Sequence, residues 1–328
     1  MTGTTMRALV LGRGPDWALV ERPVPEPGPG EVLVRNRAAA VNHGDFPMLA
    51  AADPTAGGHG EESIAGFEYA GEIVAVGPDV RGRTVGDLVF GIFPASFAEY
   101  VTVDARYLLR RSAALAPEIA CALPSALLTE YGALAAAGFA AGQSVLITGA
   151  SSGIGLVGVQ TARALGASKI IATTRSASRR GLLTELGADT VVVTGEQDLT
   201  ETVLAATDGV GVDVSLDHVG GATFAACLPA TAVDGQVVNI GRLDGPASTV
   251  DLDALSYRHL TVRGVSFGFS RPWEVVPLLE QVSEIVMPAV DDGRIRPIVD
   301  STVDVAEAAQ AAERMRSGAA VGKLVFRF

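Results

Sequence analysis

The residues with the clearest chemical meaning form a glycine-rich loop near the middle of the chain. Residues 148–155 read TGASSGIG and stand between an apolar run at 144–148 and an amphipathic stretch at 153–166. Glycine allows a tight turn and a close approach of the backbone to a pyrophosphate, and the N-terminus of the following helix offers free N–H groups to its charge. The spacing therefore predicts a dinucleotide site made by Gly149, Ser151, Ser152, Gly153, Ile154 and Gly155.

The residues after the next apolar run indicate which nicotinamide cofactor is bound. An NAD site places an acid there to hold the ribose hydroxyls, whereas arginine and small hydroxyl residues serve the 2′-phosphate of NADPH. Residues 172–180 read ATTRSASRR, with no acid before Glu185. A planar guanidinium binds phosphate in a bidentate way, which favours NADPH. The expected contacts are Arg175 first, then Thr174, Ser176 and Arg179; a solvated helix start is the alternative, and it stays open for Arg179 and Arg180.

Two kinds of element would position this loop. From residue 119 onward, apolar runs at 144–148, 169–173, 190–193, 212–216, 235–240 and 260–266 alternate with helical stretches. Buried parallel strands read as such continuous runs, so this part predicts an α/β fold with a six-stranded doubly wound sheet. Residues 1–118 show short β-type runs spaced by glycine and proline turns, which predicts a small β-barrel-like domain. The tail, 296–328, is expected to return to this first domain, leaving the cofactor between two lobes.

Bulk composition narrows the classes of partner. The formal net charge is −12, which argues against nucleic acid because phosphate neutralisation needs clustered cations. The two cysteines, Cys121 and Cys227, lie too far apart to indicate a disulfide framework or a zinc knuckle. No apolar run reaches the roughly 18 residues of a membrane span, and the first residues lack a signal-type apolar region. The expectation is a cytoplasmic protein with a small-molecule partner and no membrane or nucleic-acid partner.

The sequence motifs before and after the glycine-rich loop indicate which family the chain resembles. The loop alone resembles that of short-chain dehydrogenases, but no tyrosine has the lysine four residues later that their catalysis needs. The whole chain instead resembles the medium-chain dehydrogenase/reductase superfamily. This resemblance is carried by residues 66–77 (GFEYAGEIVAVG), 85–90 (VGDLVF), 144–155, 186–189 (LGAD) and 322–325 (GKLV). It implies a GroES-like β-barrel-type catalytic domain at 1–118, completed by 296–328, and a Rossmann NADPH-binding domain at 119–295.

The same resemblance bears on zinc. Zinc-dependent members carry an early cysteine and a Gly-His-Glu in this signature, whereas the present chain reads VNHGD at 41–45 and GFE at 66–68. Phe67 cannot bind a metal. An improvised site from His43, Asp45 and Glu68 is disfavoured, because catalytic zinc uses three well-placed ligands. No metal is expected, and the Asn-x-x-Asp pattern resembles the zinc-independent quinone oxidoreductase (zeta-crystallin-like) branch.

Chemistry without a metal favours a conjugated acceptor, because a quinone or enone spreads the arriving charge. The predicted function is an NADPH-dependent reductase that transfers hydride to a quinone or an α,β-unsaturated carbonyl compound. Two alternatives stay open: an enoyl- or ketone-reducing tailoring enzyme of secondary metabolism, and a low-turnover NADPH-binding sensor or scaffold protein. Asn42 and His43 are the catalytic candidates, and Phe46 stands near where many relatives carry a tyrosine. The proton donor is therefore left unassigned.

Further cofactor contacts follow from strand ends, where open α/β sheets bind ligands. Val219, Ile240, Gly241 and Phe267 are expected on the nicotinamide side. By resemblance, Thr129 and Lys323 are also expected to contact the cofactor. Glu68 is read as a satisfied structural carboxylate. A homodimer is expected by resemblance, joined through the sheet edge near 260–266.

Overall fold

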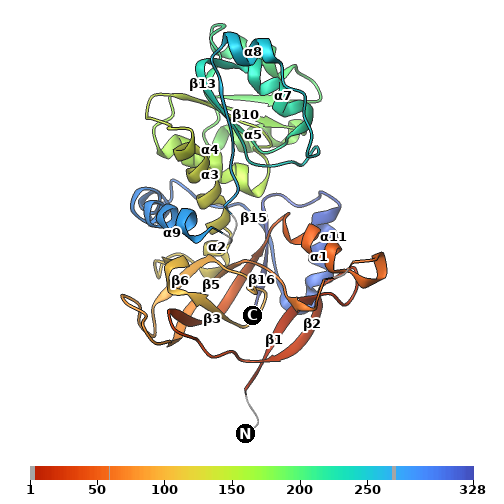
Figure 1. Cartoon of the computed structure of the whole chain (residues 1–328), viewed down its shortest axis with the longest axis vertical. Coiled ribbons are helices and arrows are strands. Elements are labelled where there is room, and N and C mark those ends of the chain that lie inside the picture. The colour runs from red at the N-terminus through yellow and green to blue at the C-terminus, as the bar shows by residue number, and fades with distance from the viewer. Residues whose placement is uncertain (1–3, 59, 268–270) are drawn as a thin grey trace. The chain divides into compact units, whose positions relative to one another are not determined.

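The computed structural model describes residues 4–58, 60–267 and 271–328. The chain divides into two compact units, which Figure 1 traces by colour along the sequence. Unit 1 comprises Met1–Ser125 and Pro297–Phe328, and unit 2 comprises Ala126–Arg296. The boundaries expected from the sequence lay at 118/119 and 295/296. Each unit has its own sheet and core.

Unit 1 is built mainly from strands. Its larger sheet has the strand order β15-β16-β3-β5-β6-β8, with β7 also paired to β3, and its smaller sheet has the order β2-β1-β4. The strands are β1 (Thr5–Leu11), β2 (Ala18–Pro23), β3 (Glu31–Val41), β4 (Ser63–Ile64), β5 (Glu68–Val76), β6 (Leu88–Ile92), β7 (Tyr100–Asp104), β8 (Leu108–Arg110), β15 (Val299–Asp304) and β16 (Lys323–Arg327). The helices are α1 (Asp45–Ala52), α2 (Pro117–Ala120) and α11 (Ala308–Arg316). The predicted β-rich first domain is confirmed.

The core of unit 1 joins the two ends of the chain. Phe97 is fully buried, and its ring meets Trp17 edge-on at 5.4 Å and Phe326 edge-on at 5.1 Å between centroids. Edge-to-face contacts at this spacing suit the quadrupoles of aromatic rings. Phe326 lies on β16, which pairs antiparallel with β3 from Leu324 opposite Val41 to Arg327 opposite Ala38. The tail after residue 297 is therefore part of this unit.

Unit 2 contains the sheet that carries the glycine loop. Its six described strands have the order β11-β10-β9-β12-β13-β14, and every pairing is parallel. The strands are β9 (Ser144–Ile147), β10 (Lys169–Thr174), β11 (Thr190–Val193), β12 (Val212–Asp217), β13 (Thr231–Asn239) and β14 (Thr261–Gly264). This confirms the predicted doubly wound sheet. The strand order reverses direction at β9, where such sheets bind ligands at their carboxyl ends.

From residue 153 onward, the helices of unit 2 contact either this sheet or one another (Figure 1). They are α4 (Gly153–Ala164), α5 (Arg180–Glu185), α6 (Leu199–Ala206), α7 (Gly221–Ala230), α8 (Leu252–Tyr257), α9 (Pro272–Gln281) and α10 (Met287–Asp291), with a π-helical turn at Val282–Val286. Leu146, Ile171 and Val192 of neighbouring strands share one buried cluster with Phe224 and Leu228 of α7. The continuous apolar runs of the sequence reflect strands buried in this way.

Three elements differ from what the sequence pattern indicates, one of them because of a proline and one because of pairing with a distant strand. The apolar residues 117–136 form two helices, α2 and then α3 (Pro124–Ala136), rather than one. Pro124 begins α3 because proline lacks an N–H and suits a first helical turn but not an interior one. β3 is longer than the short runs expected in this domain, because residues 38–41 pair with β16 from the far end of the sequence. The first strand of the tail, β15, begins only at Val299.

The stretch containing α2 and α3, Pro117–Ala136, is long and apolar enough to cross a membrane by length and composition, which the sequence analysis did not anticipate. Buried core helices pass the same test, and 72% of its most apolar window is buried inside the protein. Packing rather than lipid contact accounts for its apolar character.

Candidate functional site

The glycine loop has the geometry that a pyrophosphate site needs. Gly149 has φ +59°, a left-handed conformation that is strained for residues with a side chain. At Gly155, an added Cβ would lie 2.6 Å from the Cα of Ala150, so this turn admits only glycine. The Ser152 hydroxyl caps α4 by accepting a hydrogen bond from the Gly155 N–H at 3.1 Å. The loop thus presents the N-terminus of a twelve-residue helix, the end that attracts an anion.

The end of β10 lies beside this loop. Thr174 is buried, and its Oγ1 lies 3.1 Å from the Ser151 hydroxyl and accepts a hydrogen bond from the Ser176 N–H at 3.2 Å. Arg175 and Ser176 are exposed. The Arg175 guanidinium has no hydrogen-bond or ion-pair partner among the described residues. Its five donors are therefore open to a phosphate.

The two other arginines of this run differ from Arg175. Arg180 donates to the carbonyl oxygen of Val191 at 3.1 Å, so its guanidinium anchors α5 to β11. Arg179 is half-buried, and its backbone N–H bonds the carbonyl of Ser176. The sequence left open whether these arginines bind phosphate or only belong to a solvated helix start. Arg180 has a structural partner, Val191. The side chain of Arg179 has no such partner among the described residues.

Asp217, at the end of β12, ties three strand ends together, and the sequence analysis did not identify it. It is fully buried and accepts hydrogen bonds from the Thr148 hydroxyl at 2.8 Å, the Gly220 N–H at 3.0 Å and the Asn239 side chain at 2.9 Å. Four lone-pair sites on one carboxylate allow this many donors. Its position as the last strand residue before His-Val-Gly-Gly was the available signal.

Asp217 also holds the predicted nicotinamide-side residues, through both its backbone carbonyl and its side chain. The backbone carbonyl of Asp217 accepts hydrogen bonds from the N–H groups of Ile240 at 2.7 Å and Gly241 at 3.1 Å. Val219 donates its N–H to the Asp217 side chain at 3.1 Å. Val219, Ile240 and Gly241 are all half-buried at the same carboxyl edge of the sheet. The structure therefore brings these three predicted residues together.

Phe267 and Thr129 lie near α3. The Phe267 ring packs on Gly132, where an added Cβ would lie 2.5 Å from its Cζ. Thr129, on the same helix, is half-buried. Glu130, the next residue on this helix, was not predicted from the sequence. It is fully buried, and its Oε1 atom lies 2.8 Å from Nε2 of His218.

Unit 1 contains a second buried polar cluster, made by Asn42, Glu68 and Lys323. The Lys323 ammonium donates to Glu68 Oε2 at 2.6 Å and to the Asn42 side-chain oxygen. Asn42 Nδ2 donates to the same Glu68 oxygen at 2.7 Å. The other oxygen of Glu68 accepts from the Ser125 N–H at 2.8 Å. The side chains of Glu68 and Lys323 are 0% and 3% exposed, so the ion pair is shielded from water.

Asp45 and His43 flank this cluster differently. Asp45 is buried, and its carboxylate accepts from the Asn42 N–H at 2.7 Å. Burial raises the pKa of Asp45 to about 7, although the Asn42 N–H acts in the opposite direction. His43 is exposed. Of the two catalytic candidates, Asn42 is held by Glu68 and Lys323, and His43 stands outside the cluster.

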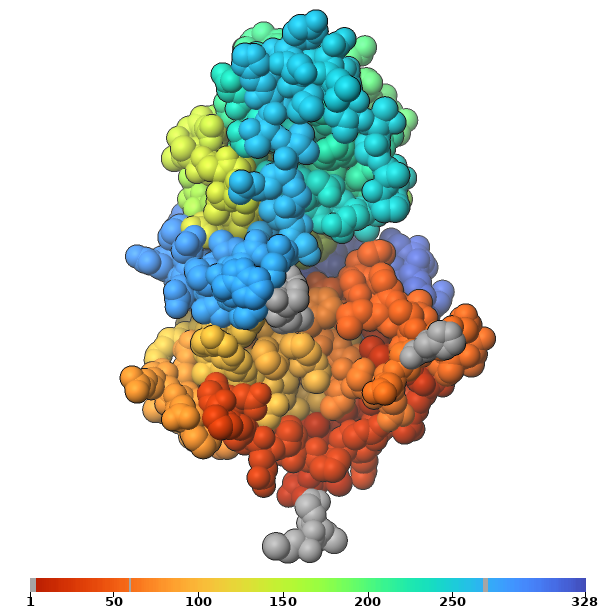
Figure 2. Space-filling model, in the orientation of Figure 1, coloured from red at the N-terminus to blue at the C-terminus, as the bar shows by residue number. Residues whose placement is uncertain are grey.

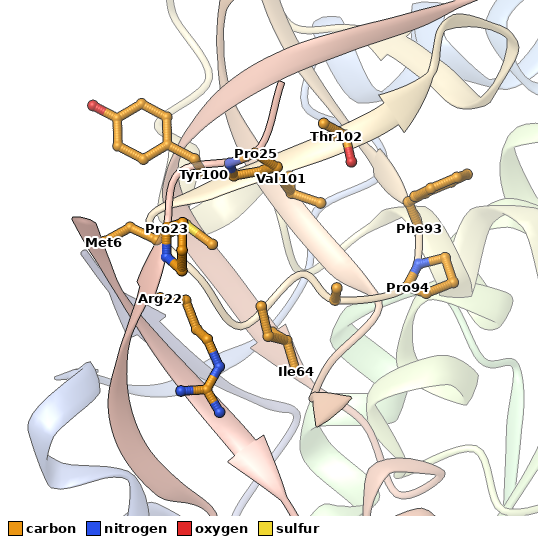
Figure 3. Close-up of a pocket in the computed structure, with 11 residues that line it drawn as sticks. Met6, Arg22, Pro23, Pro25, Ile64, Phe93, Pro94, Tyr100, Val101 and Thr102 are labelled. Carbon is orange, nitrogen blue, oxygen red and sulfur yellow. The ribbon is translucent and has the colours of Figure 1, made fainter. Parts of the chain in front are cut away.

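Unit 1 also has a pocket of about 390 Å³, shown in Figure 3. Its lining is largely apolar, with Met6, Ile64, Phe93 and Val101 among the side chains. In Figure 3 the Tyr100 hydroxyl and the Arg22 guanidinium point away from each other. Arg22 also pairs with Glu62. None of the predicted site residues lines this pocket, so it is not part of the candidate site.

Two family patterns match the chain. Residues 28–113 match the alcohol dehydrogenase GroES-like domain, and residues 153–283 match the zinc-binding dehydrogenase domain. An L-threonine 3-dehydrogenase of Pyrococcus furiosus is 34% identical over 280 residues, which cover 76% of this chain and 79% of that enzyme. The chain belongs to the medium-chain dehydrogenase/reductase superfamily.

Other superfamily relatives differ in length and activity. A mycocerosic acid synthase-like polyketide synthase of Mycobacterium tuberculosis is 34% identical over 306 residues, covering 91% of this chain. The chain spans only 14% of the length of that synthase. A mycobacterial quinone oxidoreductase has a similar structure, with a TM-score of 0.86, 27% identity, and coverage of 98% of this chain and 100% of that chain. A mycobacterial protein solved with NADPH has a TM-score of 0.85, 26% identity and the same coverage.

The zinc described for this superfamily does not suit the residues present. Among the described residues, no three His, Cys, Asp or Glu side chains gather in a way that could hold a metal ion. Glu68, from the signature that supplies ligands in zinc members, is neutralised by the Lys323 ammonium at 2.6 Å. Phe67 has no donor atom, and a zinc ion beside Glu68 would be repelled by the ammonium.

A nicotinamide dinucleotide does suit the superfamily fold of unit 2. The glycine turn at residues 149–155, the capped N-terminus of α4 and the exposed Arg175 offer complementary groups to its phosphates. Lys323, also expected at the cofactor, is buried in unit 1 with its ammonium held by Glu68 and Asn42. Its contact with a cofactor stays a prediction.

Removing the Lys323 charge should strongly destabilise unit 1. Lys323→Met leaves Glu68 buried without a counter-charge, for which a loss of about 3–5 kcal/mol in the free energy of unfolding is expected. The double variant Glu68→Gln/Lys323→Met should regain most of this loss, because no charge is then stranded. Urea unfolding of the three proteins measures both effects.

Arg106→Met serves as the matched control, because Arg106 is 64% exposed in its ion pair with Asp104. That substitution should cost less than about 1 kcal/mol. A Lys323→Met variant no less stable than Arg106→Met would contradict the assigned ion pair.

Proposed function

We propose that this chain is a zinc-independent, NADPH-dependent reductase that transfers hydride to a quinone or an α,β-unsaturated carbonyl compound. The observation that carries the proposal is the buried triad of Glu68, Asn42 and Lys323. In it, the lysine ammonium neutralises the carboxylate of the signature in which zinc members carry Gly-His-Glu. The likeness in structure to a mycobacterial quinone oxidoreductase supports the same conclusion.

The preference for NADPH over NADH rests on the end of β10. Thr174, Arg175 and Ser176 stand where an NAD site would carry an acid, and the Arg175 guanidinium has no partner among the described residues. A 2′-phosphate placed there would receive bidentate hydrogen bonds from Arg175 and further ones from the hydroxyls. The complex of a mycobacterial structural relative with NADPH is consistent with this assignment.

The residues of the triad define what the protein itself contributes to the reaction. Bound NADPH would supply the hydride. Glu68 and Lys323 hold the Asn42 amide in one orientation, with one of its two N–H hydrogens bonded to Glu68. The second N–H remains for an acceptor oxygen. With no metal to stabilise a localised alkoxide, a conjugated acceptor that delocalises the charge is the substrate class that suits this site. Its proton can come from solvent.

A second candidate function is favoured by the polyketide synthase match, which covers 91% of this chain at 34% identity. An enoyl- or ketone-reducing tailoring step in secondary metabolism would use the same cofactor. It differs in the acceptor, which would be an acyl thioester or a ketone rather than a quinone.

NADPH oxidation should be fastest with quinones or enones, because those acceptors need the least charge stabilisation. The purified protein is tested with NADPH against a quinone, an enone, an enoyl thioester and a simple ketone, with absorbance at the nicotinamide band as the readout. The reverse reaction is tested with L-threonine and NADP⁺. Activity should survive a chelator. Turnover that is lost on chelation and restored by zinc would contradict the proposal, and tight NADPH binding without any turnover would favour a sensor or scaffold role.

Arg175→Ala should weaken NADPH binding roughly 10- to 100-fold while leaving NADH binding unchanged, because only NADPH offers the 2′-phosphate. Fluorescence titration with both cofactors measures the two dissociation constants. Arg180→Ala is the control, since Arg180 donates to Val191 and should not alter the ratio of the two constants. An unchanged ratio in Arg175→Ala would refute the phosphate contact.

We also propose a homodimer joined through β14. This strand is the described edge of the unit 2 sheet, and all four of its residues are exposed. Leu252 and Tyr257, just before it, are 68% and 79% exposed. Figure 2 shows this part of unit 2 at the surface, in the light-blue colours of residues near 250. An unpaired strand edge with apolar neighbours suits a twofold sheet extension.

Light scattering after size exclusion should give twice the chain mass of 33.7 kDa. Val262→Lys, in the middle of β14, should shift the protein toward monomer, because a charge at the paired edge repels its own copy. Val85→Lys, at a 63% exposed site in unit 1, should leave the mass unchanged. A monomeric wild-type protein at micromolar concentration would overturn this assignment.

A further inference from the structure

Glu130 and His218 form a buried charged pair in unit 2 that the proposed reaction does not use directly. Glu130 lies on α3, and His218 directly follows β12. Their side chains are 0% and 6% exposed, and Glu130 Oε1 lies 2.8 Å from His218 Nε2. At this distance the two groups attract each other as opposite charges. Two ionisable groups rarely occupy a core without a purpose that offsets their desolvation.

The surroundings of the imidazole determine its protonation. His218 Nδ1 lies 3.0 Å from the carbonyl oxygen of Thr148, which can only accept, so Nδ1 carries a hydrogen. Nε2 faces the Glu130 carboxylate, and a bare nitrogen lone pair there would be repelled. A hydrogen must therefore lie between Nε2 and the carboxylate, and because the Glu130 charge raises the pKa of His218, this hydrogen belongs to the imidazole. His218 is an imidazolium, and Glu130 is its counter-ion.

Thr148 is the residue that this pair holds. The Thr148 carbonyl accepts from His218 Nδ1, and its hydroxyl accepts from the His218 backbone N–H at 2.9 Å. The same hydroxyl donates to Asp217 at 2.8 Å. Thr148 immediately precedes Gly149, whose φ of +59° starts the glycine turn. The position of the imidazole ring thus affects the position of the Thr148–Gly149 peptide, at which the loop begins.

Gly158 gives independent support that the carboxylate is built into this place. It lies on α4, the helix that begins at the glycine loop, and an added Cβ there would lie 2.4 Å from Glu130 Cδ. Only a glycine leaves room for the carboxylate against α4. Glu130 is therefore packed between α3 and α4 and faces the strand ends of β9 and β12.

The charges around His218 set the direction of its titration. Burial by itself lowers the pKa of His218, but Glu130 from α3 and Asp217 from β12 outweigh it, so the pKa lies above its ordinary value. The contacts from β9 and α4, Thr148 and Gly158, carry no charge. Because the pKa of His218 is raised, the imidazolium stabilises the folded state fully at pH values below the ordinary histidine pKa near 6.5. This stabilisation is lost as the pH rises through the higher pKa of His218 in the folded protein.

We propose that Glu130 and His218 are positioning residues for the cofactor: their ion pair fixes the Thr148 carbonyl, and with it the glycine loop, and releases both when the imidazolium loses its proton in alkaline solution. After that loss, the Nε2 lone pair faces the carboxylate at 2.8 Å and the ring must move. The Thr148 contact moves with it. This inference rests on the proposed binding of NADPH.

Two measurements on the intact protein test it. The first is the nitrogen-15 NMR spectrum of the imidazoles, which distinguishes imidazolium from neutral imidazole; with four histidines in the chain, a His218→Asn variant identifies the signal of His218. The second is the dissociation constant of NADPH between pH 7.5 and 9.5. The 2′-phosphate stays fully ionised there, since its second pKa is near 6.

In the wild-type protein, His218 should remain an imidazolium at pH 7.5, and NADPH binding should weaken about tenfold as it deprotonates. Glu130→Gln keeps the shape of the side chain, and its amide can donate to a neutral Nε2. His218 should then be neutral at pH 7.5, NADPH affinity should stay within about threefold of wild type, and the alkaline loss should disappear. Glu201→Gln removes an equal charge from an exposed site on α6 and should behave as wild type.

The outcomes separate the possible failures. A neutral His218 in the wild-type protein at pH 7.5 overturns the ion pair. The expected spectra with the same alkaline loss in wild type and Glu130→Gln, or with no loss in either, overturn the positioning role. These wild-type titrations stand even if Glu130→Gln does not fold. Absence of NADPH binding at every pH contradicts the proposed function instead, while the spectra still report on the pair.

Discussion

The structure of unit 1 depends on the pairing of one buried carboxylate. Glu68 is fully inside the unit, and an isolated charge there would be prohibitively unfavourable, so a cation must reach it. The cation is Lys323, which arrives on the C-terminal strand β16 and lies between Glu68 and the Asn42 side chain. This requirement links residues from three distant parts of the sequence. It also orients the Asn42 amide, which the proposed function assigns to the acceptor, and leaves Glu68 unsuited to a metal.

Unit 2 meets a comparable demand with Asp217. This carboxylate gathers the Thr148 hydroxyl, the Gly220 N–H and the Asn239 amide, so the carboxyl ends of β9, β12 and β13 are held at one place. Parallel sheets bind nucleotides at that edge. The Glu130–His218 pair adds a second hold on the same residue, Thr148. The glycine loop thus starts from a position set by two buried polar networks rather than by packing alone.

These networks explain how one superfamily fold can host different chemistry. The backbone of the glycine loop and the sheet edge serve any nicotinamide dinucleotide, whereas a few side chains decide which cofactor and which acceptor are used. Arg175 leaves five donors open at the end of β10, while Arg180, five residues later, is tied to Val191. Phe67 and Lys323 remove the conditions for a metal beside Glu68. In the proposed function, cofactor choice and acceptor class would therefore be set by different side chains in different units.

The sequence by itself determined the parallel sheet, the glycine turn and the absence of an acid after β10, because apolar periodicity and glycine spacing are local properties of the chain. It also indicated from a family signature that Glu68 is a satisfied carboxylate. Tertiary structure decided which cation satisfies it and that Arg175, unlike Arg180, has no side-chain partner in the part of the chain that the structure describes. It also revealed the hydrogen-bond partners of Asp217 and the ion-pair partner of Glu130. Such residues gain meaning only when strands far apart in sequence bring their partners within hydrogen-bonding or ion-pairing distance, and no local pattern encodes that distance.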